Sequence, residues 1–124
     1  MREMIPKKIS KIDFALMHCV AIYPPEDKQV NLNKILTLKK SYPYPIGFSD
    51  HSLGTEMPIA SIALGARVIE KHFTDDTSRD GPDHPFSMDP CSWKKMVEDT
   101  RILEQSLGNS IKKVEENLKK GQFS

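Results

Sequence analysis

Three short apolar segments, each followed by a helical pattern, constrain the fold of this chain more than any other feature. The segments span residues 14–20, 45–49 and 66–73, and each is bounded by turn-forming or charged residues. Each has the length of a β-strand. The first segment is almost entirely apolar, which predicts a strand that is covered on both faces.

Two of the intervening segments are predicted to be helices. Residues 30–40 place an apolar stripe on one face, and residues 56–64 form a second apolar stretch. Pro58 lies in the first turn of the second helix, where proline is tolerated, and Gly65 follows it as a stop signal. The stripe of the first helix comprises Leu32, Ile35, Leu36 and Lys39.

The last helix has the clearest boundaries. Asp89 is a candidate N-cap, Pro90 is the expected first helical residue, and Gly108 is the expected stop. Five apolar side chains fall mostly on one face at helical spacing. They are Trp93, Met96, Val97, Leu103 and Leu107.

The order strand, helix, strand, helix, strand, helix predicts an α/β fold with parallel strands and crossover helices, about three βα units in all. A sheet of three parallel strands leaves two open edges, which stable proteins generally cover. Residues 1–110 are therefore expected to form part of a larger structure. Residues 111–124 are mostly charged between residues 111 and 120, and they are expected to form a solvated tail or linker.

The composition excludes several classes of function. The net charge is +1, with 18 basic and 17 acidic residues, so the basic excess of a typical nucleic-acid-binding domain is absent. The sequence contains neither an apolar run of about 20 residues, which would span a membrane, nor a secretory signal at its start. Cys19 and Cys91 form no CxxC pair, and we expect two reduced thiols in a cytoplasmic protein.

Polar side chains gather where the predicted strands end. His51 and His72 are 21 residues apart, about the length of one helix with its connections, so they are expected at the same rim of the sheet. Two imidazoles with the carboxylates of Asp50, Glu70 and Asp83 nearby suit a divalent metal that keeps positions open for water or substrate.

Several of these residues also have purely structural interpretations. The Tyr23-Pro24-Pro25 segment is also typical of a turn, and Ser49 of an N-cap-like residue. His18 lies inside an apolar strand and is expected to be a core histidine. His84 is open to either a loop-stabilising role or a substrate contact. Glu70 and His72 are two residues apart on a strand and should therefore point to the same side.

Four blocks of this sequence resemble the C-terminal part of the sialic acid synthase barrel. They read HCVAIYP, IGFSDHSLG, IASIALGARVIEKHFT and GPDHPFSMDP, and the resemblance covers roughly residues 14–120. The family includes N-acetylneuraminate, legionaminate and pseudaminate synthases and spore-coat polysaccharide homologues. The resemblance implies the C-terminal portion of a (β/α)8 TIM barrel, with the tail leading towards an antifreeze-like domain that is absent here.

The resemblance also implies roles for individual residues. His51 and His72 match the ligands of a divalent metal, manganese or magnesium, which holds the aldehyde oxygen of the acceptor sugar. Glu70 matches a carboxylate close to phosphoenolpyruvate, and either Glu70 or Asp83 is expected to act as the catalytic acid or base. The residues expected to contact substrates are Tyr23, Ser49, Asp83 and His84.

The function expected from this resemblance is condensation of phosphoenolpyruvate with an N-acyl hexosamine aldehyde, with release of phosphate. The family's phosphate-binding lysines lie on earlier strands, so the chain alone is expected to be inactive and to associate with the other barrel half or with itself. Ala21 and Ile22 stand where many members carry polar side chains, which leaves the sugar open. The alternatives are a non-enzymatic metal-binding or self-associating half-barrel, and a metal-dependent hydrolase or aldolase.

Overall fold

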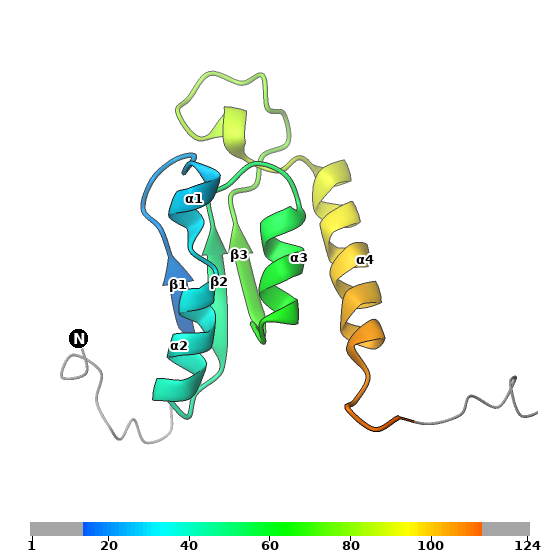
Figure 1. The fold of residues 1–124 in the computed structure, drawn as a ribbon. Coiled ribbons are helices and arrows are strands. Elements are labelled where there is room, and N and C mark those ends of the chain that lie inside the picture. The colour runs from blue at the N-terminus through cyan, green and yellow to red at the C-terminus, as the bar shows by residue number, and fades with distance from the viewer. Residues whose placement is uncertain (1–13, 113–124) are drawn as a thin grey trace, which may run out of the picture.

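The three apolar segments form one parallel sheet. The computed structural model describes residues 14–112, and in it the strand order is β1-β2-β3 (Figure 1). The strands are β1 (Leu16–Cys19), β2 (Ile46–Asp50) and β3 (Val68–Lys71), and both pairings are parallel. The predicted α/β sheet with two outer strands is therefore confirmed.

The two faces of the sheet have different surroundings. Ile46 and Phe48 point towards the helices and join a buried core with Val30, Ile35 and Ala66. On the opposite face, Cys19, Ser49 and Glu70 lie side by side in register, and Cys19 and Glu70 are exposed. The prediction that the first strand is covered on both faces is therefore wrong, because the helices cover only one face within residues 14–112.

The predicted helix over residues 30–40 is interrupted near its start. Val30 is the last residue of a short helix that was not predicted, α1 (Asp27–Val30); Asn31 follows it with a left-handed φ of 49°, and α2 (Asn33–Ser41) forms the rest of the predicted helix. Asparagine tolerates this conformation better than most residues, which explains the break. The predicted apolar stripe is also partly wrong: Ile35 is fully buried, but Leu36 is 38% exposed, and Leu38 packs on the core instead.

The other two helices agree with the prediction. α3 (Glu56–Ala63) is followed by Gly65, whose φ is 104°. α4 (Pro90–Leu107) begins after Asp89, whose side chain accepts a hydrogen bond of 2.8 Å from the backbone N–H of Ser92, as an N-cap does. Gly108 is its C-cap residue.

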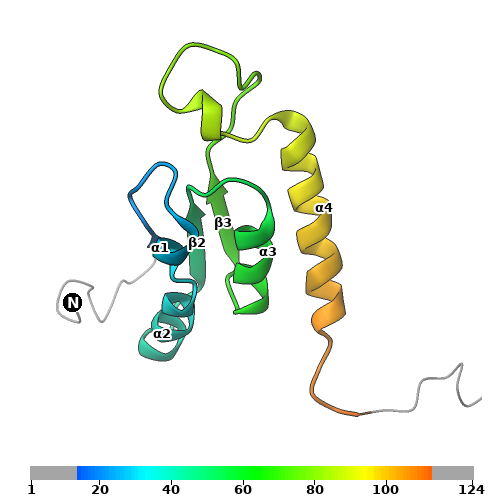
Figure 2. The same ribbon diagram turned by 45° about the horizontal axis from the view of Figure 1, so that its top comes forward.

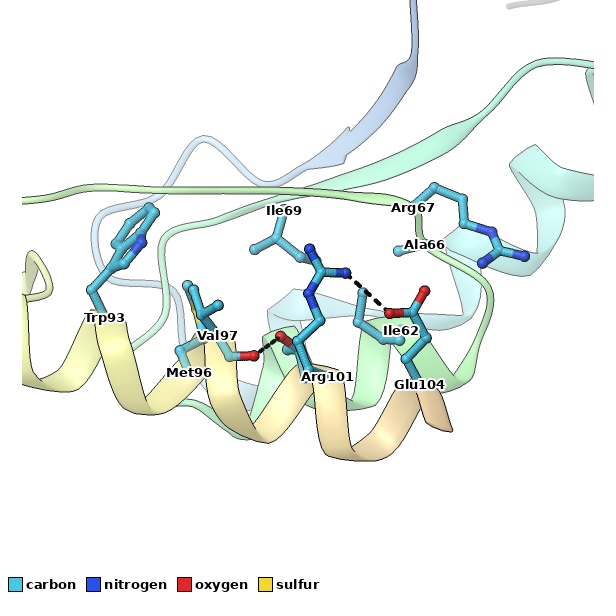
Figure 3. A pocket seen from close by; sticks show the side chains of 10 residues that line it. Ile62, Ala66, Arg67, Ile69, Trp93, Met96, Val97, Arg101 and Glu104 are labelled. Atoms are coloured by element: carbon cyan, nitrogen blue, oxygen red, sulfur yellow. Dashed lines mark hydrogen bonds and ion pairs between the residues drawn. The ribbon is translucent and has the colours of Figure 1, made fainter. Parts of the chain in front are cut away.

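α4 packs on α3 (Figures 1 and 2). A cavity of about 220 Å³ lies between α4, α3 and β3. Figure 3 shows Trp93, Met96 and Val97 of α4 along this cavity, with Ile62 of α3 and Ile69 of β3 across from them. Met96 is buried. Val97 is 41% exposed and Leu107, at the far end of α4, is 50% exposed. The predicted apolar face of this helix is therefore only partly covered.

The remaining expectations concern the cysteines, the tail and membrane segments. Cys19 and Cys91 form no disulfide, as predicted, and both are exposed. Most of the predicted charged tail, residues 113–124, lies outside the described residues. Among the helices within residues 14–112, none combines the length and apolar character required to cross a lipid bilayer.

Candidate functional site at the strand ends

His51 and His72 lie together at the C-terminal ends of neighbouring strands. His51 directly follows β2 and His72 directly follows β3, and these strands are hydrogen-bonded to each other. The centroids of the two imidazole rings are 5.4 Å apart, and the ring planes are 75° from parallel. The prediction that both side chains share one rim of the sheet is confirmed.

The ring of His51 is held in one orientation. Its Nδ1 lies 2.7 Å from the carbonyl oxygen of Val20. A carbonyl oxygen only accepts, so Nδ1 carries the proton and Nε2 presents a lone pair when the ring is neutral. Tyr23 stacks on the same ring with centroids 4.1 Å apart and is itself half exposed. His51 is 7% exposed, so the orientation of its ring is well defined by its surroundings.

Ser49 and Glu70 join the two strands on the same face. The hydroxyl of Ser49 donates to Oε1 of Glu70 over 2.6 Å. Because the hydroxyl proton is engaged there, it is not available to His51 Nε2, which lies 3.5 Å from Ser49 Oγ. Ser49 lies inside β2, so the alternative of an N-cap-like residue is wrong.

The segment after β3 brings further side chains to the rim. The backbone N–H of Met88 donates to the carbonyl oxygen of His72 over 2.8 Å, which returns the chain to the end of β3. Asp83 Oδ2 lies 3.8 Å from His72 Nδ1, and the Asp83 side chain is 61% exposed. The ring of Phe86 meets that of His72 edge-on, with centroids 5.2 Å apart. Phe86 was not among the residues singled out from the sequence.

Two histidines make structural contacts. His84, in a short 3-10 helix (His84–Phe86), has its Nδ1 2.7 Å from the hydroxyl oxygen of Thr74, which is the contact expected of a loop-stabilising residue. His18 is 5% exposed and its Nε2 donates to the carbonyl oxygen of Val30 over 2.7 Å. The prediction of a core histidine at position 18 is confirmed.

The sequence suggested that Asp50 lies beside the two histidines, but its side chain points to the opposite face of the sheet. It lies on the helix-facing side of β2, where its Oδ2 forms a 2.5 Å ion pair with Lys71 Nζ. The alternation of side chains along a strand places Ser49 and His51 on one face and Asp50 on the other. The expectation that Asp50 adds a carboxylate beside the metal ligands is therefore corrected.

The arrangement fits a metal site with few protein ligands. In the neutral ring, His51 Nε2 presents a lone pair, and a second imidazole lies beside it; neutral imidazole is the commonest protein ligand of metal ions. Within residues 14–112, His, Cys, Asp and Glu side chains form no group of three that could hold one ion. Two histidine ligands would leave most coordination positions to water or substrate.

Two cavities of the fold lie away from the candidate residues. The cavity beside α4 contains none of the candidate residues, and neither does a second cavity of about 370 Å³ near Tyr44, Pro45 and Gly65. At the histidine rim, Tyr23 is half exposed and the Asp83 side chain is 61% exposed.

Comparison with known proteins identifies relatives of this chain. The N,N'-diacetyllegionaminic acid synthase of Legionella pneumophila is 45% identical over 102 residues, which are 82% of this chain and 29% of that protein. The crystal structure of N-acetylneuraminic acid (sialic acid) synthetase from Leptospira borgpetersenii is similar with a TM-score of 0.78 and 39% identity, over 87% of this chain and 38% of that one. The crystal structure of the spore coat polysaccharide biosynthesis protein SpsE from Bacillus subtilis has a TM-score of 0.74 and 47% identity, over 84% of this chain and 30% of that one.

This chain therefore spans about a third of the length of the relatives that it matches. The profile of one protein family matches almost all of the chain, residues 3–112. The strand-end motifs, the parallel sheet and these similarities agree with one another: the chain belongs to the NeuB family.

Proposed function

We propose that this chain is the C-terminal portion of a (β/α)8 barrel of a sugar-acid synthase, and that it supplies the metal-binding half of the active site. The observation that carries the proposal is the placement of His51 and His72 on adjacent strand ends, beside the Ser49–Glu70 hydrogen bond. Its support is the family match over residues 3–112 and the relatives that are named as sialic acid and legionaminic acid synthases.

The proposed reaction joins phosphoenolpyruvate to an N-acyl hexosamine in its open aldehyde form. Carbon 3 of phosphoenolpyruvate attacks the aldehyde carbon, water adds at carbon 2, and the carbon–oxygen bond to phosphate breaks. Carbon 3 is a weak nucleophile, so the aldehyde must be made more electrophilic. A divalent cation, manganese or magnesium, held by the two imidazoles would polarise the aldehyde oxygen as a Lewis acid.

The side chains around the pair have matching proposed roles. Glu70, fixed by Ser49, and Asp83, beside His72, are the two carboxylates placed to move the protons that water addition and alkoxide protonation require. Tyr23 covers one face of His51 and is half exposed, so an acceptor sugar could reach it. Ser49 is proposed to contact phosphoenolpyruvate, and His84 to shape the substrate loop through Thr74.

Mn²⁺ binding by the 124-residue chain tests the metal half-site, with electron paramagnetic resonance as the readout. We expect His51→Ala and His72→Ala to abolish binding, and His84→Ala to retain it as the matched histidine control. Equal binding by all four proteins would contradict the assignment of the ligands.

Phosphate release tests the reaction itself. The chain is combined with the N-terminal barrel part of a relative, phosphoenolpyruvate, N-acetylmannosamine and Mn²⁺, and each part is also assayed alone. We expect release only from the combination, and further acylated hexosamines are tried in the same assay. Release from neither the combination nor the parts with any of these sugars would refute the enzymatic proposal.

One structural observation favours a second candidate, a self-associating module without catalytic activity. Val68 is 42% exposed and Glu70 is exposed, so the edge strand β3 presents an uncovered face within the described residues. Size-exclusion chromatography with and without Mn²⁺ distinguishes the two candidates. A stable dimer that gains no activity on addition of the N-terminal part would favour the second.

A further inference from the structure

A buried polar network lies behind the histidine pair, on the helix-facing side of the sheet. The side chains of Lys71 and Asp50 are 2% and 1% exposed and form an ion pair of 2.5 Å. Lys71 Nζ also donates to the carbonyl oxygen of Ser52 over 2.5 Å. Asp50 Oδ1 accepts from the backbone N–H of Ser52 at 2.9 Å and from its hydroxyl at 2.7 Å. We call these three residues the Asp50–Lys71–Ser52 network.

The burial of this ion pair is weak evidence that it serves the stability of the core. Removing two charges from water is costly, and apolar residues of similar volume often serve equally well in place of a buried ion pair. The neighbouring inward-facing positions on the same side of β2, Ile46 and Phe48, are apolar. A buried Asp50–Lys71 ion pair among apolar neighbours is best explained by the backbone segments that it holds in position.

The network holds the backbone on both sides of His51 and immediately before His72. Asp50 precedes His51 and Ser52 follows it, and all three hydrogen-bonding groups of Ser52 (its N–H, its carbonyl oxygen and its hydroxyl) are engaged by Asp50 or Lys71. Lys71 precedes His72. The ion pair therefore links the end of β2 to the end of β3 at the level of the two imidazoles.

Contacts on the other face of the sheet restrain the ring of His51 rather than its backbone. The His51 ring is held by the carbonyl oxygen of Val20 and by the stacked ring of Tyr23, and neither contact restrains the backbone after His51. The backbone of that segment is restrained from behind, by Asp50 and Lys71. From this we infer that the Asp50–Lys71–Ser52 network is a positioning device that fixes His51 relative to His72.

The inference rests on the proposed function only for its metal readout, because the ring geometry can be measured without metal. The decisive variant is the double substitution Asp50→Leu/Lys71→Met, which replaces the charges with apolar groups and so retains the fold while releasing Ser52. The matched control is Asp99→Leu/Lys95→Met, which makes the same changes in an exposed ion pair of α4. A further variant, Asp50→Asn, retains an acceptor for Ser52 but leaves Lys71 without a counter-charge.

The first readout is nuclear magnetic resonance of the metal-free chain. In the wild type and in the α4 control we expect a slowly exchanging His51 Nδ1 proton and His51 ring signals shifted by the Tyr23 ring. In the Asp50→Leu/Lys71→Met variant we expect fast exchange of that proton and loss of the shift, with an unchanged far-ultraviolet circular dichroism spectrum.

The second readout is Mn²⁺ affinity. Loss of groups that orient metal ligands typically weakens metal binding about 10- to 100-fold, and we expect a loss of this size in the double variant. We expect Asp50→Asn to unfold at a lower temperature than the wild type and yet to bind Mn²⁺ within about threefold of it, because Ser52 stays held. Wild-type signals and wild-type affinity in the folded double variant would overturn the inference. Failure of the wild type to bind Mn²⁺ would instead refute the proposed function, and the resonance experiment would still decide the role of the network.

Discussion

Replacement of Gly47 even by alanine is predicted to destabilise the fold, although the backbone conformation of Gly47 is ordinary for a strand. It is the second residue of β2, the central strand, and lies in register with Met17 of β1 and Val68 of β3. A Cβ at this position would lie 2.9 Å from the carbonyl oxygen of Val68 and would also overlap the side chain of Met17. Met17 is flexible and can move aside, but the Val68 oxygen belongs to the neighbouring strand and can move only with it.

The expected cost follows from this difference. Overpacking a close-packed interior typically destabilises a protein by about 1–3 kcal/mol. For a domain of this size, each kcal/mol lowers the Tm by about 4–8 °C. We therefore expect Gly47→Ala to lower the Tm by several degrees or more, most of it because β3 must shift away from β2.

A double-mutant cycle separates the two contacts. Urea unfolding is followed by circular dichroism for the wild type, Gly47→Ala, Met17→Ala and the double variant. If the Val68 oxygen dominates, Gly47→Ala destabilises the Met17→Ala background nearly as much as it destabilises the wild type. A free energy of unfolding for Gly47→Ala within about 0.5 kcal/mol of the wild type, the range of ordinary surface substitutions, would refute the reasoning.

Three further substitutions have definite expected outcomes. Ser49→Ala removes one hydrogen bond to the exposed Glu70 and should lower the free energy of unfolding in urea by only about 1 kcal/mol, with Ser49→Thr restoring it. Phe48→Ala empties a core position that is 1% exposed and should cost about 3–5 kcal/mol in the same assay. Hydrogen bonds from the Ser92 backbone N–H and hydroxyl lower the pKa of Asp89 below its ordinary value of 3.8, so this N-cap stabilises the fold above that pH and ceases to do so as the pH falls through the lowered value. Asp89→Ala should accordingly have a lower Tm than the wild type at pH 7, and thermal scans should show the difference disappearing in strong acid.

Most of the fold could be predicted because its signals are local. The N-cap Asp89, the first-turn proline and Gly108 fix the ends of α4 without reference to the rest of the chain. The break at Asn31 could not be predicted from the apolar pattern, because a left-handed residue interrupts the helix without changing the spacing of its neighbours. The exposed face of the sheet was also missed, since the apolar character of the first strand does not say how many faces are covered.

The order of the strands was sufficient to predict which residues of the candidate site share one rim of the sheet. The 21-residue separation of His51 and His72 was enough to place both rings at one rim. The same separation relates Asp50 to Lys71, and it was the available signal for their ion pair. Side chains alternate strictly up to the last residue of β2, so Asp50 points to the opposite face from Ser49 and His51. The prediction grouped Asp50 with the histidines because it precedes His51 in the sequence.

The spacing of the two imidazoles has a consequence for how the chain can be altered. Their centroid separation of 5.4 Å is close to the distance between neighbouring strands, about 4.8 Å, as expected for rings at the ends of the hydrogen-bonded strands β2 and β3, which the Asp50–Lys71 ion pair also joins. The segment between Ser52 and the start of β3, residues 53–67, therefore has no part in setting the gap. A loop inserted at the exposed Leu53–Gly54 turn, or a cut there, would lengthen or open the connection and leave the two rings at the same distance.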